Sequence, residues 1–175
     1  MIISLSRINL KYILSVLYFL ITTFSMQAQP KPCSDPAFSQ FDFWLGEWDL
    51  TYNDTARGTN SIKRVNDGCT IEENFNDNGQ GFRGQSWSVY NPLTKQWQQT
   101  WVDNQGGYIV LTGEFKDDKM VLTTQPIKNK DSVDVISRMI FYNIEENSLD
   151  WSWEKSEDGG KSWKVSWKIH YERRK

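Results

Sequence analysis

The chain has 175 residues, of which 20 are basic and 22 acidic, and 14% are aromatic, including nine tryptophans. This length allows one domain and leaves little room for a second. The net charge of −2 does not suit nucleic acid, whose binding rests largely on basic contacts to phosphate groups. The composition therefore predicts one aromatic-rich domain and argues against a nucleic-acid partner.

The first 28 residues differ from the rest because they contain no acidic side chain. Arg7 and Lys11 precede the apolar run 12–24, and a polar stretch with the small residue Ala28 follows. This order is typical of a secretory signal peptide, and the run is shorter than the roughly 20 residues that cross a bilayer. We predict cleavage after Ala28 and a secreted or periplasmic protein without a membrane partner; the alternative is an uncleaved anchor. The predicted organisation is a signal peptide over 1–28, an N-terminal arm over 29–40 and a barrel domain over 41–175.

The two cysteines, Cys33 and Cys69, both follow the predicted cleavage site. Because an exported protein meets an oxidising compartment, we predict one disulfide between them, which ties the N-terminal arm to the barrel wall. The alternative is a pair of free thiols that bind a metal or a redox partner. Two cysteines and a single histidine make a poor zinc site, so no metal is predicted.

From Glu47 onward, short runs of β-branched and aromatic residues alternate with turns of Asn, Asp, Gly, Pro or Lys. Short strands joined by tight reversals favour an all-β, antiparallel up-and-down barrel, because closing the sheet removes its exposed edges. A short helical turn around 35–45 is expected to cap one end. The predicted strands are 47–53, 59–66, 69–75, 82–90, 96–103, 108–115, 120–127, 134–142, 149–155 and 162–173.

Several turns carry specific signals. Asp67-Gly68 is a two-residue hairpin signal, because both residues tolerate positive φ. The Asn-Pro that begins 91–95 favours turn initiation, and 104–107 and 116–119 are further tight reversals.

The last predicted strand alternates most clearly between apolar and charged residues. Period-two contrast of this kind indicates one buried and one solvated face. We predict that Trp163, Val165, Trp167, Ile169 and Tyr171 point inward, and that Lys164, Ser166, Lys168, His170 and Glu172 point outward. The same pattern predicts an inward face for Trp48, Leu50 and Tyr52 and for Trp97, Gln99 and Trp101.

Gly46-Glu47-Trp48 resembles the Gly-x-Trp motif that begins the first strand of lipocalins and related barrels. The resemblance implies that the tryptophan lies across the barrel floor and that a basic residue of the last strand packs over its ring. Arg173 has the parity of the inward residues, so we predict a cation–π contact between Arg173 and Trp48. The alternative is that Trp48 is ordinary aromatic core.

Residues 156–163, "SEDGGKSW", fit the Asp-box pattern Ser-x-Asp-x-Gly-x-Ser-Trp. An aspartate in such a turn accepts hydrogen bonds from backbone amides, and a glycine supplies positive φ. We predict a structural staple rather than a glycosidase centre, because Asp-boxes in sialidases lie away from the catalytic site. The residues of the staple are Ser156, Asp158, Gly160, Ser162 and Trp163.

Taken in order, "FDFWLGEW" at 41–48, the Trp-x-Gln-x-Trp-Val-Asp motif at 97–103 and the Asp-box resemble a family of secreted bacterial domains of unknown function. The resemblance implies a lipocalin-like or nitrobindin-like barrel and no particular activity. Nitrobindins bind haem through a histidine near the chain end. Here His170 shares its face with lysines, so no haem cofactor is predicted, although a one-residue bulge could invert that parity.

The inward pattern places polar residues among aromatic ones, which is what a small-molecule site requires. The candidate cavity residues are Glu73, Ser86, Tyr90, Trp97, Gln99, Trp101 and Trp153. We expect binding of a small apolar or aromatic ligand, or of a glycan fragment. One alternative is a hydrolase or isomerase that uses Glu73, and another is a filled structural or interaction barrel. Ligand identity and oligomeric state stay open.

Overall fold

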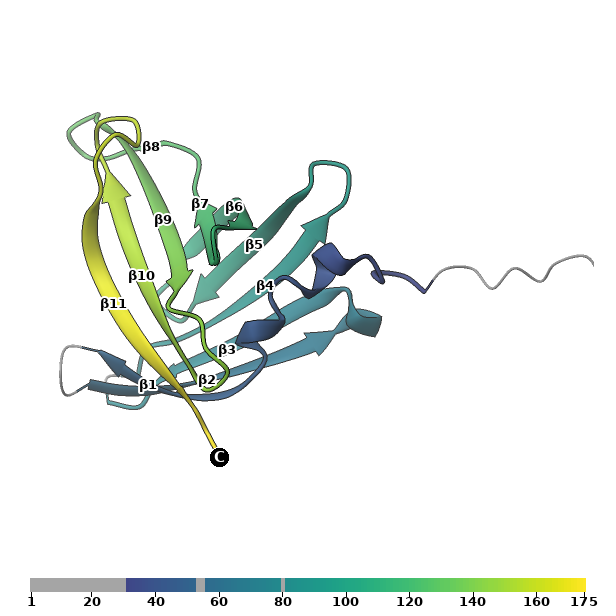
Figure 1. Ribbon diagram of the computed structural model, residues 1–175. Helices are drawn as coiled ribbons and strands as arrows, with labels where there is room; N and C mark the ends of the chain where they lie inside the picture. The colour runs from purple at the N-terminus through teal and green to yellow at the C-terminus, as the bar shows by residue number, and fades with distance from the viewer. Residues whose placement is uncertain (1–30, 53–55, 80) are drawn as a thin grey trace, which may run out of the picture. The chain divides into compact units, whose positions relative to one another are not determined.

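The computed structural model describes residues 31–52, 56–79 and 81–175 (Figure 1). Pro32–Lys175 forms one unit, and the predicted signal peptide over 1–28 lies outside the described residues. Over the described ranges, the structure contains no helix that is long and apolar enough to cross a membrane.

The strands form a closed antiparallel barrel in which each strand of the wall pairs with the next one along the chain, except that β7 pairs with β9 (Figure 1). The last strand pairs with the first, and β8 pairs only with β9, so ten strands make up the wall. The predicted fold class is confirmed. The strands are β1 (Gly46–Tyr52), β2 (Ala56–Val65), β3 (Thr70–Asp77), β4 (Arg83–Asn91), β5 (Gln96–Asp103), β6 (Tyr108–Lys116), β7 (Lys119–Thr123), β8 (Ile127–Lys128), β9 (Asp134–Tyr142), β10 (Ser148–Ser156) and β11 (Lys164–Arg173).

The predicted strand 120–127 is in fact two strands. β7 ends at Thr123 and β8 begins at Ile127. Pro126 lies between them, and proline has no N–H to donate to a ladder. The interruption leaves β8 as a two-residue strand on the edge of β9.

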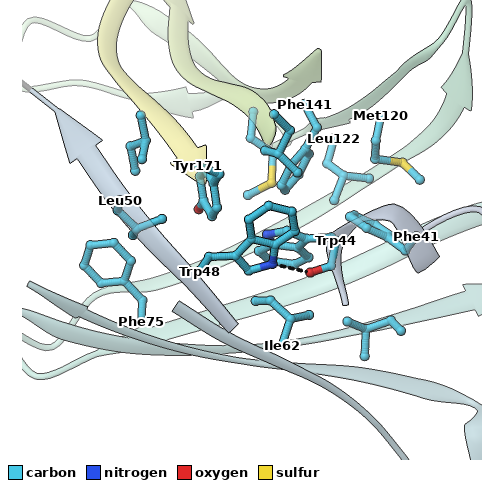
Figure 2. Close-up of a cluster of buried hydrophobic side chains, with 14 of the residues drawn as sticks. Phe41, Trp44, Trp48, Leu50, Ile62, Phe75, Met120, Leu122, Phe141 and Tyr171 are labelled. Atoms are coloured by element: carbon cyan, nitrogen blue, oxygen red, sulfur yellow. Dashed lines mark hydrogen bonds between the residues drawn. The ribbon is translucent and has the colours of Figure 1, made fainter. Parts of the chain in front are cut away.

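Two short 3₁₀ helices, η1 (Pro36–Ser39) and η2 (Asp42–Trp44), lie before the first strand, where a helical turn was predicted. Asp35 caps η1 by accepting a hydrogen bond from the amide of Ala37 at 2.8 Å. Phe41 and Trp44 are fully buried, and the Phe41 ring meets Phe141 edge-on at 5.5 Å (Figure 2). The segment is therefore an aromatic plug inside the barrel.

The predicted contact between Arg173 and Trp48 is confirmed. The guanidinium carbon lies 4.1 Å from the Trp48 ring centroid. The same guanidinium donates to the backbone oxygens of Leu45 at 2.6 Å and Phe43 at 3.3 Å. Trp48 in turn donates from Nε1 to the Trp44 oxygen at 2.7 Å (Figure 2). The first strand, the last strand and the plug thus share one group of contacts.

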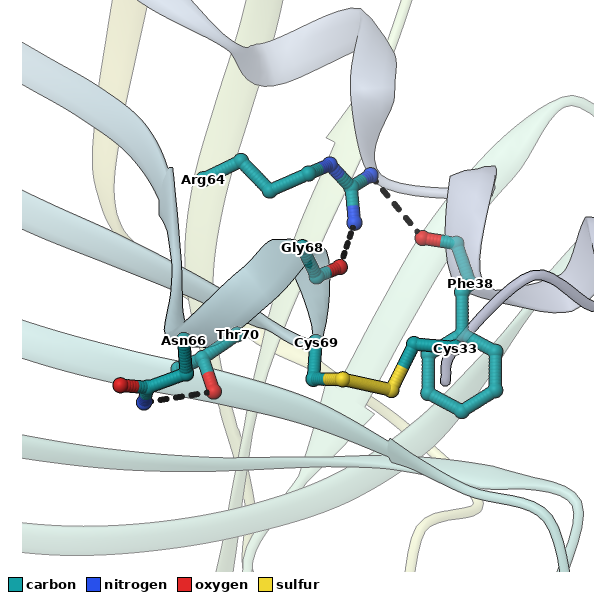
Figure 3. The surroundings of a disulfide bond; sticks show 7 residues. All are labelled: Cys33, Phe38, Arg64, Asn66, Gly68, Cys69 and Thr70. Carbon is teal, nitrogen blue, oxygen red and sulfur yellow. Dashed lines mark hydrogen bonds between the residues drawn. A yellow bond between two sulfur atoms is a disulfide. The ribbon is translucent and has the colours of Figure 1, made fainter. Parts of the chain in front are cut away.

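The predicted disulfide between Cys33 and Cys69 is present, with Cα atoms 5.2 Å apart (Figure 3). It joins the N-terminal arm to the turn between β2 and β3. Arg64 supports the same junction, donating to the Gly68 oxygen at 2.6 Å and to the Phe38 oxygen at 3.0 Å. The arm is therefore held by a covalent bond and by hydrogen bonds.

The predicted hairpin signal at Asp67-Gly68 is also confirmed, with φ values of 56° and 95°. The Cys69 amide donates to the Asn66 oxygen at 3.1 Å and closes the turn. The last ladder pair is Val65 with Thr70, so the strands end one residue earlier on each side than the two-residue signal implies.

The predicted face of β11 is correct at one end and wrong at the other. Ile169 and Tyr171 are buried, and Trp167 pairs with Trp153. The register then shifts, because Val165 pairs with Glu154 and leaves Ser166 as an extra residue. A bulge of this kind inverts the alternation, so Val165 is 43% exposed instead of inward. Trp163 precedes the strand and folds under the Asp-box loop.

Gly46 is expected to be essential to the contact between Arg173 and Trp48. Its φ is +127°, and a Cβ there would lie 2.4 Å from Arg173 Nη1. We expect Gly46→Ala to lower the free energy of unfolding by about 3 kcal/mol, from backbone strain plus displacement of Arg173. Urea unfolding, followed by tryptophan fluorescence, measures the loss.

Gly106→Ala is the matched control. Gly106 also has positive φ, +84°, but a Cβ there meets no atom within 4 Å. Gly106→Ala should therefore lower the free energy of unfolding only by the cost of backbone strain, about 1 kcal/mol. Equal losses in the two variants would contradict the role assigned to Arg173.

Candidate functional site

The barrel contains a cavity of about 190 Å³ with aromatic walls. Trp44 of the plug and Phe141 of β9 belong to its lining, and Glu73 and Tyr171 contribute polar groups. Six further aromatic side chains complete most of the wall: Phe75, Phe82, Trp101, Trp151, Trp153 and Trp167. The interior is therefore not completely filled by side chains.

The indole rings support one another. Trp151 stacks on Trp153 with ring centroids 6.4 Å apart and meets Trp167 edge-on at 5.6 Å. Phe75 makes edge contacts with both Trp101 and Trp167. Offset and edge-to-face pairs of this kind stabilise ring positions beyond simple burial, so the wall is preformed.

Trp101 is held at both sides of its ring. Asp103 Oδ2 accepts a hydrogen bond from Trp101 Nε1 at 3.0 Å. Gly84 leaves room for the ring, since a Cβ there would lie 1.9 Å from its Cζ2 atom. Asp103 Oδ1 also accepts from the amides of Gln105 and Gly107, both at 2.9 Å. Partial burial acts to raise the pKa of Asp103, but these three hydrogen bonds outweigh it and hold that pKa below its ordinary value.

Glu73 is the buried ionisable group of the cavity, with 6% of its surface exposed. Its Oε1 accepts from Asn60 Nδ2 at 2.7 Å and its Oε2 from Ser86 Oγ at 2.5 Å. Burial raises the pKa of Glu73 to about 7, although the two donors act in the opposite direction. The carboxyl group therefore changes charge near neutral pH.

Tyr171 lies beside this carboxyl group. Its hydroxyl oxygen accepts a hydrogen bond from Asn60 Nδ2 at 3.3 Å. Burial raises the pKa of Tyr171, and the charge of Glu73 adds to the effect. Tyr171 is therefore a neutral hydroxyl at any physiological pH.

The structure separates the seven predicted cavity residues into three groups. Glu73, Trp101 and Trp153 line the cavity. Ser86 and Gln99 are buried but do not line the cavity: Ser86 donates to Glu73, and Gln99 donates to Ser88 at 2.9 Å. Tyr90 and Trp97 pack instead against the plug: Tyr90 meets the Phe38 ring, and Trp97 donates from Nε1 to Gln40 Oε1 at 3.1 Å. Ligand binding by any of them stays a prediction.

Several lining residues were not among the sequence candidates. Trp151 has the same parity as Trp153, two residues away, so alternation on β10 could have identified it. Asp103 likewise shares the face of Trp101. Phe82 lies in the segment before β4 and Trp44 in the 3₁₀ helix η2, where no strand alternation indicates which way a side chain points.

The Asp-box forms the predicted staple, outside the cavity. Asp158 accepts hydrogen bonds from the amides of Lys161 and Ser162 and from the Ser162 hydroxyl. These bonds, led by that from the Ser162 hydroxyl, hold the pKa of Asp158 well below its ordinary value. Trp163 donates from Nε1 to the Gly160 oxygen at 3.0 Å, and Arg138 lies 3.9 Å from its ring centroid.

A larger groove of about 780 Å³ meets the cavity at Ile109 and Trp153. It follows the edge of β6, where β7 pairs only with Thr112–Lys116. Residues from both faces of β6 line it, including the exposed Tyr108 and the inward Ile109. The cavity and the groove therefore adjoin at Ile109 and Trp153.

His170 points away from the cavity. Its Nδ1 lies 2.7 Å from Asp150 Oδ1, and 46% of its side chain is exposed. In the described part of the chain, no group of three or more His, Cys, Asp or Glu residues is placed to hold a metal ion.

Comparisons with known protein families and with curated proteins find no match to this chain. The family resemblance of the sequence motifs therefore stays a prediction, and the site has to be interpreted from its own geometry.

The raised pKa of Glu73 predicts that stability falls as pH rises between its ordinary value of 4.5 and its folded value of about 7. In this window the native state binds more protons than the unfolded state, so each upward step favours unfolding. The loss across the window is about 3 kcal/mol. Urea unfolding of the wild-type protein and of Glu73→Gln over a series of pH values measures it.

Glu73→Gln cannot ionise, so the difference between the two proteins isolates this one group. We expect the difference in unfolding free energy to grow with pH in favour of the variant. Asp49, Asp103 and Asp158 have lowered pKa values and change charge below the window. If the difference in unfolding free energy between the two proteins stays constant with pH, Glu73 of the folded protein is ionised throughout this window.

Proposed function

We propose that this protein is an extracytoplasmic binding protein that holds a small, largely apolar ligand or a glycan fragment inside its barrel. The observation that carries the proposal is the preformed aromatic cavity with one buried carboxyl group, Glu73, among its walls. A few oriented polar groups in an apolar pocket give a small-molecule site its specificity. The groove along β6 offers the ligand a route to the cavity.

Two features support an extracytoplasmic location. The disulfide between Cys33 and Cys69 suits an oxidising compartment, and the basic start followed by the apolar run 12–24 has the pattern of a signal peptide. We also propose membership in the family that the motifs resemble. Gly46, Trp48 and Arg173 support it by packing as the Gly-x-Trp motif implies.

A second candidate function is acid–base catalysis by Glu73. The favouring observation is that its pKa is raised to about 7, close to the value at which a general acid or base works best. A turnover that Glu73→Gln abolishes, with the fold intact, would support this alternative over simple binding.

Filling the junction between cavity and groove is expected to block binding. Ile109 lies at that junction, so Ile109→Phe should weaken ligand affinity at least about tenfold by occupying cavity volume. Isothermal titration calorimetry with phenol, indole and maltose, and with any molecule that native mass spectrometry finds retained on the purified protein, measures the change.

Val89→Phe is the matched control. Val89 is 38% exposed and lines neither the cavity nor the groove, so the same substitution class should leave affinity unchanged. If no probe binds the wild-type protein and no retained molecule is found, the binding function is wrong and a structural or interaction role without a ligand is favoured.

A further inference from the structure

The charged side chains in the cavity lining are acidic. Two ionisable carboxyl groups, Glu73 and Asp103, belong to its lining, and none of the described residues that line it is lysine, arginine or histidine. A ligand that carries a negative charge would therefore meet repulsion without a counter-charge. The electrostatics favour a positive ligand or a neutral one.

The aromatic walls favour a positive ligand over a neutral one. Trp101, Trp151, Trp153 and Trp167 surround the cavity, and the π-face of an indole carries the negative end of the ring quadrupole. Tryptophan is the best of the aromatic side chains at binding a cation, and the attraction grows when the cation is removed from water. Four indoles thus line the same cavity as one buried carboxyl group, and aromatic walls of this kind bind alkylated ammonium groups.

The hydrogen bonding of Glu73 indicates which kind of cation fits. Both carboxylate oxygens already accept a donor, one from Asn60 and one from Ser86. These donors hold the carboxyl group in place and favour its charged form. A quaternary ammonium group needs charge nearby but offers no N–H, so it can pair with Glu73 without displacing either donor.

A further polar atom is available for the rest of the ligand. Trp44 is 1% exposed and lines the cavity, and its Nε1 makes no hydrogen bond of good geometry within the described residues, although it lies close enough to the Tyr171 hydroxyl to act on the pKa of that group. Buried donors are rarely left unpaired. An acceptor oxygen on the ligand would satisfy this N–H.

We propose that the cavity binds an organic cation with an alkylated ammonium head and a hydrogen-bond acceptor, with the indole faces as its cage and Glu73 as its counter-ion. This inference rests on the binding function proposed above. Ligand binding by this route draws Glu73 into its charged form, so affinity and proton release are linked.

The test compares choline with 3,3-dimethylbutan-1-ol, a neutral molecule of nearly the same shape, by isothermal titration calorimetry. We expect choline to bind at least about tenfold more tightly. Because choline itself does not titrate, its affinity for the wild-type protein should rise by about tenfold or more from about pH 5.5 to about pH 8.5, while that of the alcohol stays level. The groups that face Glu73 are the neutral Tyr171, Asn60 and Ser86, with Asp103 in the same lining and its pKa already low.

Two variants locate the counter-ion. Glu73→Gln should lose at least about tenfold in choline affinity and keep its affinity for the alcohol. Glu72→Gln removes the same charge from the neighbouring, outward residue of β3 and should change neither affinity. If Glu73→Gln does not fold, the pH series on the wild-type protein still decides the question.

The failures of the two proposals are distinguishable. If the alcohol binds as tightly as choline, or if only phenol, indole or maltose binds, the cavity is a binding site but the cationic ligand is wrong. A choline affinity that is independent of pH would overturn the assignment of Glu73 as counter-ion. If no compound binds at all, both the ligand class and the binding function fall together.

Discussion

The contact of Arg173 with Trp48 is the constraint on which the rest of the structure depends. It joins the last strand to the first at the register pair that closes the barrel. The same guanidinium holds two backbone oxygens at the end of the plug, and Trp48 holds a third. Closure of the barrel and docking of the plug therefore depend on the same group of contacts. An open sheet would leave these plug carbonyls without their donors, and loss of the plug would remove two acceptors from the guanidinium and leave it the Glu146 oxygen.

The cavity follows from this arrangement. The plug fills the barrel with Phe41 and Trp44, and beyond them the wall is built from large rings that contact one another edge-on rather than meeting at the axis. Rings arranged in this way leave a cavity of about 190 Å³ between them. Glu73 then lies in a place where a carboxyl group weakens the fold at neutral pH. That cost is the physical reason to propose a functional role for Glu73.

Much of the barrel could be predicted from the sequence, because its strands have one solvent-exposed face and one buried face. The predicted bounds of 96–103 and 134–142 coincide with β5 and β9. The bulge at Ser166 could not be predicted, since an extra residue leaves the local pattern intact and is visible only in the partner strand. Inward direction was predictable for Trp97 and Trp101 alike. Only the position of the plug along the barrel determines that Trp97 contacts Phe41 while Trp101 reaches the cavity.

The same carboxyl group connects stability with binding. Above neutral pH the charged Glu73 lowers the stability of the empty protein, because the charge is desolvated by the aromatic wall. A cation in the cavity would offset that penalty, since it supplies the missing counter-charge inside the same wall. The ligand would then stabilise the protein most where the empty barrel is weakest. Asn60 and Ser86 make this possible, because they hold the carboxyl group in one position whether or not it is charged. In the proposed binding mode, the cost of burying a charged Glu73 without a counter-ion is thus what would favour a positive ligand in the cavity.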